Sequence, residues 1–317
     1  MANTPLMWTY FIQLGSNMWN EVGNTRGRAH RSTPSASETF LFDRGAWNEH
    51  TEMLRDIGVN TLVIDIGEAL RYERHPEINV KGSWDHETMR AEAERLRAMG
   101  FELIPKLNFS ACHDVWLGEY SRMLSTKPYY EVCRDVIDEV CEVFKPEHFH
   151  LGMDEETAQN QVRLNHCTVR QHDLWWHDLY YLIECVERHN ARPWVWSDYG
   201  WNNEEVFFAK MPREVMQNNW YYGAEFDPEK LSESGKAHLA LFDKLSERGY
   251  DQVPTGSVWS KRENMEGLVR YCAAHIDPAH LAGFMQSSWE RTDPAWMHVH
   301  RTGAETLAAA KAWYEAR

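Results

Sequence analysis

The sequence lacks the long apolar segment that would carry the chain across a membrane. No run approaches the roughly 20 apolar residues that a bilayer-spanning helix needs. Residues 1–8 do not show the charged and then apolar pattern of a secretory signal. We therefore expect neither a membrane partner nor a secretory leader.

The sequence also lacks a basic cluster. Its 33 lysines and arginines are outnumbered by 48 aspartates and glutamates, and the formal net charge is −15. A chain of this charge repels the phosphate backbone of a nucleic acid. Nucleic acids are therefore excluded as expected partners.

No C-x-x-C pair occurs among the six cysteines, which are scattered through the chain. In a chain of this length, such cysteines are typical of buried thiols in a reducing compartment. The pattern predicts a cytoplasmic protein. We expect neither a metal centre nor another cofactor.

Glycine-rich phosphate motifs are absent as well. Neither G-x-G-x-x-G nor G-x-x-x-x-G-K-[ST] follows a predicted strand, which disfavours a doubly wound nucleotide-binding sheet. Short apolar runs instead alternate with helical patterns, as is typical of βα units and a parallel sheet. The predicted strands are residues 8–14, 61–66, 102–107, 148–153, 193–197, 215–220, 252–259 and 283–288.

Eight strands in about 300 residues fit the α/β class with a single (β/α)8 TIM barrel over residues 1–317. No Gly-Ser linker or low-complexity tract divides the chain. A polar stretch at about 20–40 predicts a long loop over the site, because loops on a barrel carry function. Amphipathic patterns predict helices at 86–99, 129–144, 173–189, 229–248, 262–275 and 294–314.

Three acids, Asp154, Glu155 and Glu156, directly follow the fourth predicted strand. Barrels and open α/β sheets place their chemistry at this end of the strands. Neighbouring carboxylates in different environments acquire different pKa values, which suits an acid/base and an orienting group. The alternative is that the acids merely begin a helix, where they offset its dipole.

Polar and aromatic residues gather at the other strand ends too. The chain holds 15 tryptophans, and several fall where a predicted strand finishes. Flat indole faces stack on the C–H faces of sugar rings, so a ring of such residues predicts a carbohydrate pocket; core packing is the alternative. The strand-end residues are Glu68, His113, Trp196, Asp198, Trp220, Tyr221, Trp259, Trp289 and Glu290.

The fourth-strand motif resembles a signature of glycoside hydrolase family 20, the β-N-acetylhexosaminidases. Residues 150–155 read H-L-G-M-D-E, and the family signature is H-x-G-G-D-E. His113 is similar to the histidine of the family's P-G-H turn, and Glu68 to its acid at the end of strand two. Trp220-Tyr221 resembles its W-Y pair, and Trp289-Glu290 its closing W-x-E motif. The likeness covers residues 60–291.

The resemblance implies an exo-acting, retaining glycosidase that removes terminal GlcNAc- or GalNAc-type sugars by substrate assistance. Glu155 would be the general acid/base, with its pKa raised by partial burial or by neighbouring acids. Asp154 would hold the N–H of the substrate's 2-acetamido group while the acetamido oxygen attacks the anomeric carbon. The remaining residues would bind the sugar: Tyr221 donates to the acetamido oxygen, Trp196, Trp259 and Trp289 wall its methyl group, and Glu68 and Glu290 bind hydroxyls.

The chain departs from the family pattern at several positions. Met153 replaces a glycine, Lys106 replaces an acid, and the spacer in Trp289-Glu290 is missing. Residues 1–317 contain no counterpart of the family's accessory domain, and its hydroxyl-binding arginine has no counterpart on the first strand. Substitutes in the loop that follows this strand would be Arg26, Arg28 or Arg31. These departures indicate a divergent branch.

Three other readings remain open. An ordinary retaining glycosidase would use Glu155 as acid/base and Glu68 or Glu290 as nucleophile, with the carboxyls near 5 Å apart. A metal-dependent hydrolase would use His148, His150, Asp154 and His113 as ligands. A non-catalytic sugar-binding barrel would keep the tryptophans and lack a working acid.

Overall fold

The protein folds as an eight-stranded parallel barrel, as the sequence predicts. The computed structural model describes residues 5–24 and 35–317. Every strand pair is parallel, in the order β6-β5-β4-β3-β2-β1-β8-β7. Parallel bridges Gln217–Gln252 and Trp220–Thr255 join β6 to the segment of β7 and close the ring. The strands are β1 Met7–Gln13, β2 Thr61–Asp65, β3 Glu102–Lys106, β4 His148–His150, β5 Arg192–Trp196, β6 Met216–Asn218, β7 Thr255–Ser257 and β8 Gly283–Ser287.

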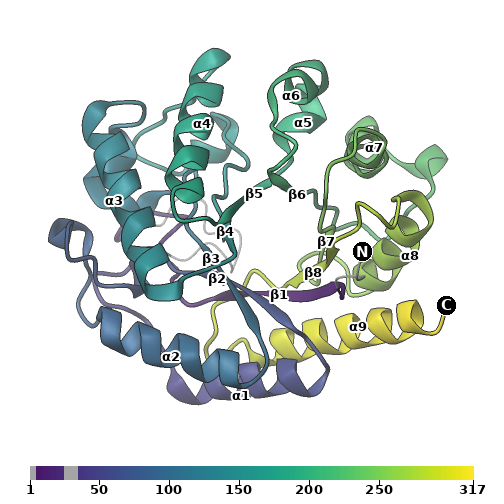
Figure 1. Cartoon of the computed structure of the whole chain (residues 1–317), viewed down its shortest axis with the longest axis horizontal. Coiled ribbons are helices and arrows are strands. Elements are labelled where there is room, and N and C mark those ends of the chain that lie inside the picture. The colour runs from purple at the N-terminus through teal and green to yellow at the C-terminus, as the bar shows by residue number, and fades with distance from the viewer. Residues whose placement is uncertain (1–4, 25–34) are drawn as a thin grey trace.

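Helices surround the barrel, as Figure 1 shows. All six predicted helical segments are helical, with ends that differ by a few residues. Three α-helices of the described residues were not predicted from the sequence: α1, which begins at an Asp43 cap, and the short α5 and α6 after β5. The helices are α1 Arg44–Asp56, α2 His86–Ala98, α3 Lys127–Phe144, α4 Asp173–Glu187, α5 Tyr199–Asn202, α6 Glu204–Lys210, α7 Glu233–Glu247, α8 Asn264–His275 and α9 Met297–Glu315.

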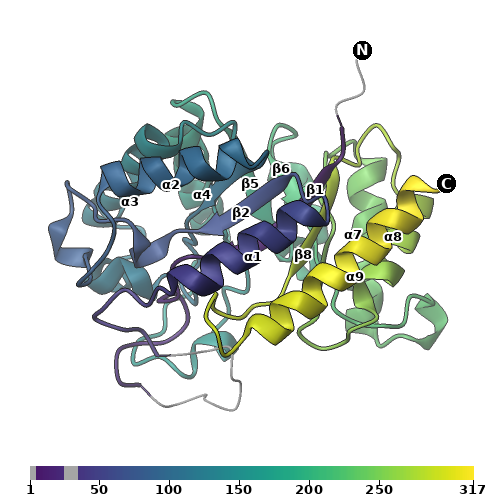
Figure 2. The same ribbon diagram turned by 90° about the horizontal axis from the view of Figure 1, so that it is seen from below.

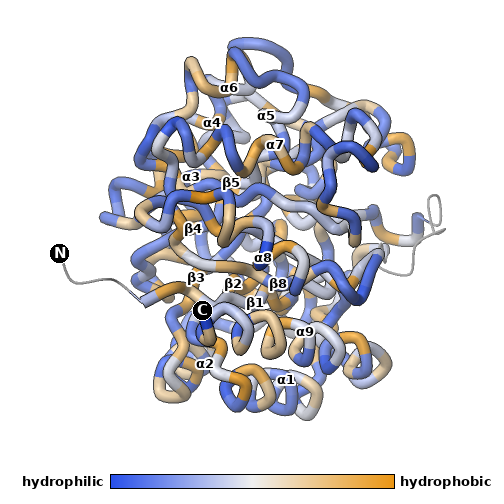
Figure 3. Tube along the Cα trace, turned by 90° about the vertical axis from the view of Figure 1, so that its right-hand side faces the viewer, coloured by the Kyte–Doolittle hydropathy of each residue, from blue (hydrophilic) through white to orange (hydrophobic). Residues whose placement is uncertain are grey.

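The outer face of the barrel is covered by amphipathic helices. Helices α1 and α9 run beside one another across β1 and β8, as Figure 2 shows. Apolar and polar stretches alternate along the helices in Figure 3, because one side of each helix packs on the barrel. Among the described helices, none combines the length and apolar composition that crossing a bilayer requires.

The barrel interior is a packed core that ends in a charged layer. Phe11, Val63 and Ile104 belong to an apolar cluster inside the barrel. One step towards the C-terminal ends, Lys106 Nζ lies 2.6 Å from Asp65 Oδ2 and 5.3 Å from the centre of the Phe11 ring. A buried ammonium needs a carboxylate partner, and Asp65 is that partner here. The pair explains how the barrel accommodates a lysine at position 106, where the family has an acid.

The predicted long loop lies after β1. Its described parts, 20–24 and 35–40, flank residues 25–34, so the substitutes Arg26, Arg28 and Arg31 lie outside the described residues. The connection starts earlier than predicted, directly after β1 at Leu14, and therefore also includes Trp19.

Candidate active site

The backbone turns sharply after β4, and this turn places the two acids. Gly152, Met153 and Glu155 all have positive φ, at 72°, 72° and 55°. The turn is held by His150, whose Nδ1 accepts a hydrogen bond from the Gly152 amide at 3.0 Å and whose Nε2 lies 3.3 Å from Asn218 Oδ1. Burial, and then Lys106, lowers the pKa of His150 well below its usual value. His150 is therefore a neutral histidine of the core.

Asn108 fastens the same turn from the end of β3. Its Oδ1 accepts from the Met153 amide at 3.3 Å, and its Nδ2 donates to Asp154 Oδ1 at 2.8 Å. A Cβ on Gly152 would lie 2.1 Å from Asn108 Oδ1. Met153 keeps the left-handed backbone that favours glycine, although its side chain is buried in the core. Left-handed non-glycine residues cost about 1–3 kcal/mol and cluster at functional sites.

His113 brings the two acids together. Its Nε2 lies 3.3 Å from Glu155 Oε2 and 3.4 Å from Asp154 Oδ2. Burial opposes charge on His113, but Cys112, Asp154 and a hydrogen bond to Glu155 together raise its pKa well above the usual value. The structure thus places an imidazole with a raised pKa against both carboxylates.

The pKa of Glu155 is lowered, which corrects the expectation that it is raised. Burial does raise this pKa, but the hydrogen bond and charge of His113, and then the charge of Arg163, outweigh it. Behind the acid, Asp198 Oδ2 accepts the Glu155 amide N–H at 2.8 Å. Burial, and then Asp154, raises the pKa of Asp198 well above its usual value. Asp198 therefore supports Glu155 from behind and does not line the cavity described next.

The acids open into a cavity of about 240 Å³. Its aromatic wall contains all four predicted tryptophans: Trp196 and Trp289 have ring centres 5.7 Å apart, and Trp220 stacks on Tyr222 at 4.7 Å. Trp259 stands at the rim, 37% exposed. The described lining consists of Trp19, His113, Asp154, Glu155, Arg163, Trp196, Trp220, Tyr222, Trp259 and Trp289.

Three lining residues, Trp19, Arg163 and Tyr222, were not predicted as site residues. Arg163 ties two of the surrounding loops together, because its guanidinium donates to the carbonyls of Trp19 at 2.9 Å and Cys112 at 3.1 Å. Trp19 and Arg163 lie in loops rather than at strand ends, so no periodic pattern marked them. The signals in the sequence that could have identified them are the charge of Arg163 and the aromatic ring of Trp19, each in a loop segment.

The structure corrects the role expected of Tyr221. Its hydroxyl donates to the Glu225 carbonyl at 2.6 Å, and its ring packs on Phe226. The next residue, Tyr222, lies in the cavity wall instead. Burial raises the pKa of Tyr222 well above its usual value, so its hydroxyl stays protonated.

The predicted hydroxyl-binding acids lie outside the described lining. Glu68 is 2% exposed, and its carboxylate accepts from the amides of Ser16 at 2.8 Å and Asn17 at 3.1 Å. Burial raises the pKa of Glu68 to about 7. Glu68 therefore anchors the loop that carries Trp19, which corrects the prediction that it binds sugar hydroxyls. Glu290 is half-buried beside Trp289, and its role stays a prediction.

Glu156, the third acid of the motif, is structural. Its carboxylate accepts from Arg170 Nε at 3.0 Å and from the Ala111 amide at 3.1 Å. Arg170 also pairs with buried Asp178 at 3.2 Å. The motif therefore sends two acids into the cavity and one into a buried ion-pair network.

Of the four metal ligands considered from the sequence, His113 and Asp154 lie close together, whereas His148 and His150 do not join them. His148 Nδ1 lies 3.1 Å from Glu102 Oε1, and His150 belongs to the core. Glu155 completes the group instead: His113, Asp154 and Glu155 offer ligand atoms that all lie within 4.8 Å of one another.

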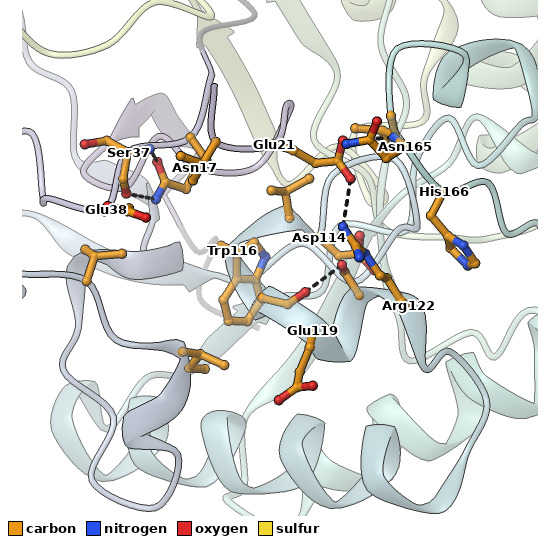
Figure 4. Close-up of a pocket in the computed structure, with 18 of the residues that line it drawn as sticks. Asn17, Glu21, Ser37, Glu38, Asp114, Trp116, Glu119, Arg122, Asn165 and His166 are labelled. Atoms are coloured by element: carbon orange, nitrogen blue, oxygen red, sulfur yellow. Dashed lines mark hydrogen bonds and ion pairs between the residues drawn. The ribbon is translucent and has the colours of Figure 1, made fainter. Parts of the chain in front are cut away.

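A second and larger cavity, of about 580 Å³, lies nearby on the same end of the barrel. Figure 4 shows Glu21 and Arg122 pointing towards each other across it, with an Oε1–Nη2 distance of 3.2 Å. Its described lining contains neither Asp154 nor Glu155. The smaller cavity is therefore the candidate active site.

The fold and cavity together define a (β/α)8 barrel with an acid pair inside an aromatic cup. Several solved structures resemble this chain in fold. A β-N-acetylhexosaminidase from Bacteroides fragilis has a TM-score of 0.60 at 12% identity, over 98% of this chain and 71% of that one. The GH20 β-N-acetylhexosaminidase from Streptomyces coelicolor gives 0.61 at 11%, over 97% and 68%. Dispersin B gives 0.56 at 13%, over 85% and 94%.

These similarities confirm the resemblance to glycoside hydrolase family 20 at the level of the fold. No protein-family model matches the chain, and no curated protein matches it.

The turn after β4 generates the first prediction. Gly152→Ala would press its Cβ on Asn108 and strain φ, so we expect at least about 2 kcal/mol of lost stability. Gly82→Ala is the matched control, because Gly82 also has positive φ but nothing within 4 Å of an added Cβ. Urea unfolding of both variants measures the difference, and equal losses would contradict this account.

The acid cluster generates the second prediction. In His113→Asn the pKa of Glu155 rises, because the imidazole that lowers it is removed while burial, which raises it, remains. Infrared titration of the carboxyl band, with Glu155→Gln to assign it, measures the pKa. His275→Asn, which removes an exposed partner of Asp243 at 3.0 Å, is the control. An unchanged Glu155 pKa in His113→Asn would contradict the assigned contact.

Proposed function

We propose that the protein is a retaining, substrate-assisted exo-β-N-acetylhexosaminidase that removes terminal GlcNAc- or GalNAc-type sugars. The observation that carries the proposal is the pairing of Asp154 and Glu155 at one edge of an aromatic cup. These are the two carboxylates in the described lining. The neighbouring folds named above support the same class of reaction.

The size and chemistry of the cup suit one sugar ring. Its volume of about 240 Å³ lies below the roughly 300–1,000 Å³ of pockets that hold drug-sized ligands. Indoles from four strand ends supply flat apolar faces, and the acids and Arg163 supply polar partners. A pocket for one ring favours release of a terminal sugar over cleavage within a chain.

In the proposed reaction, Asp154 accepts the acetamido N–H while the acetamido oxygen attacks the anomeric carbon. The hydrogen bond from Asn108 fixes Asp154 Oδ1, which leaves Oδ2 towards the cavity side where His113 lies. The negative charge of Asp154 stabilises the oxazolinium that forms. Tyr222, which lines the cavity where Tyr221 does not, would donate to the acetamido oxygen.

Glu155 protonates the departing glycosidic oxygen and later accepts a proton from the attacking water. The neighbouring His113, whose Nε2 lies 3.3 Å from Glu155 Oε2, shares this proton with the Glu155 carboxylate. His113 and Glu155 thus act as a proton-sharing pair.

The two-carboxylate alternative has less support. Its nucleophile would be Glu68 or Glu290, yet the Glu68 carboxylate is engaged by Ser16 and Asn17. Neither acid belongs to the described lining of the cavity. An acetamido nucleophile needs no such second acid.

A panel of chromogenic glycosides, with and without a 2-acetamido group, tests the proposal. We expect hydrolysis of the acetamido sugars, and at least about a 100-fold lower kcat in Glu155→Gln. The loss should shrink for good leaving groups, which need little protonation. Glu119→Gln, an exposed acid of the other cavity, is the control and should retain full activity.

Two results would contradict the proposal. Equal hydrolysis of glycosides with and without a 2-acetamido group would exclude substrate assistance. An equal loss for good and poor leaving groups in Glu155→Gln would exclude Glu155 as the acid.

A further inference from the structure

The cluster of His113, Asp154 and Glu155 has the dimensions of a metal site. Ligand atoms bound to tetrahedral zinc at about 2.0–2.1 Å lie about 3.3–3.4 Å from one another. His113 Nε2 lies 3.3 Å from Glu155 Oε2 and 3.4 Å from Asp154 Oδ2. The ligand atoms of the three residues all lie within 4.8 Å of one another. The imidazole therefore stands at tetrahedral spacing from each carboxylate, and the two carboxylates lie within 4.8 Å of one another.

Hydrogen bonds from neighbouring residues hold both acids of the cluster in place. Asn108 holds Asp154 Oδ1 at 2.8 Å, which fixes the carboxylate and leaves Oδ2 for the metal. Asp198 fixes the backbone of Glu155 in the same way, through the Glu155 amide. Two carboxylates would neutralise the charge of a divalent ion. The ligands also line an open cavity, so an ion has an entry path and a fourth position for water.

We propose that this cluster is an inhibitory zinc site, in which one Zn²⁺ binds His113 Nε2 and one oxygen each of Asp154 and Glu155. The ion occupies the place of the sugar's reacting centre and takes the two acids out of use. Binding itself does not depend on the proposed function, whereas the inhibition rests on it. Imidazole and carboxylate ligands favour zinc over magnesium or calcium, which prefer oxygen alone.

Isothermal titration with ZnCl₂ tests the site directly. The titration uses Cys167→Ser protein, because exposed Cys167 beside exposed His166 is a second place where zinc can bind. We expect one zinc per chain. Adding His113→Asn should weaken binding at least about 100-fold, since it removes the nitrogen ligand. MgCl₂ should show no binding of comparable affinity.

Two further measurements keep the result decisive. Asp154→Asn in the same background should also weaken zinc binding, and it replaces His113→Asn if that variant fails to fold. His275→Asn, which removes an exposed histidine paired with Asp243, should leave binding unchanged. Unchanged binding in both His113→Asn and Asp154→Asn would overturn the site.

Activity is measured separately, in buffer containing EDTA. Inhibition by zinc should be competitive with the acetamido glycoside and lost on adding the chelator. If zinc binds at the cluster but no glycoside is hydrolysed in EDTA, the proposed function fails and the site stands. If hydrolysis proceeds and zinc does not bind, the site fails and the function stands.

Discussion

The hydrogen bonds around the turn after β4 are the constraint on which the rest of the site depends. Three residues with positive φ would not hold this conformation alone. Asn108 from the end of β3 accepts the Met153 amide, and His150 from β4 accepts the Gly152 amide. Because both come from rigid parts of the barrel, the acids project into the cavity from a fixed base. A glycine at position 152 makes the close approach of Asn108 possible.

Electrostatics divides the neighbouring acids into different roles. Glu155 faces His113 and Arg163, and its pKa falls. Asp198 lies behind it, where burial and Asp154 raise the pKa. Glu156 points into the core and pairs with Arg170. The same chemical group thus acquires distinct behaviour from its surroundings, which is how one barrel end can hold both an acid and an orienting group.

The sequence predicted the barrel because strand runs and helical periodicity are strong over its whole length. It also predicted that Asp154, Glu155 and the strand-end tryptophans gather, since parallel strands end at one edge. Tyr221 was predicted to line the site, whereas Tyr222 does. Neighbouring residues near a strand end face opposite sides, so a shift of one residue decides which of them faces the cavity. Arg163, which reaches the cavity from the long connection between β4 and α4, was not predicted. Only three-dimensional contacts could show that His113 lowers the pKa of Glu155.

The affinity of a thiazoline analogue, which mimics the cyclic intermediate of acetamido attack, tests the central claim most directly. The account predicts that it binds far more tightly than free N-acetylglucosamine, because the site is complementary to the charged intermediate. Asp154→Asn should remove most of that preference by removing the stabilising charge. Equal binding of the analogue and the free sugar, together with covalent labelling of Glu290 by a 2-fluoro glycoside, would contradict it.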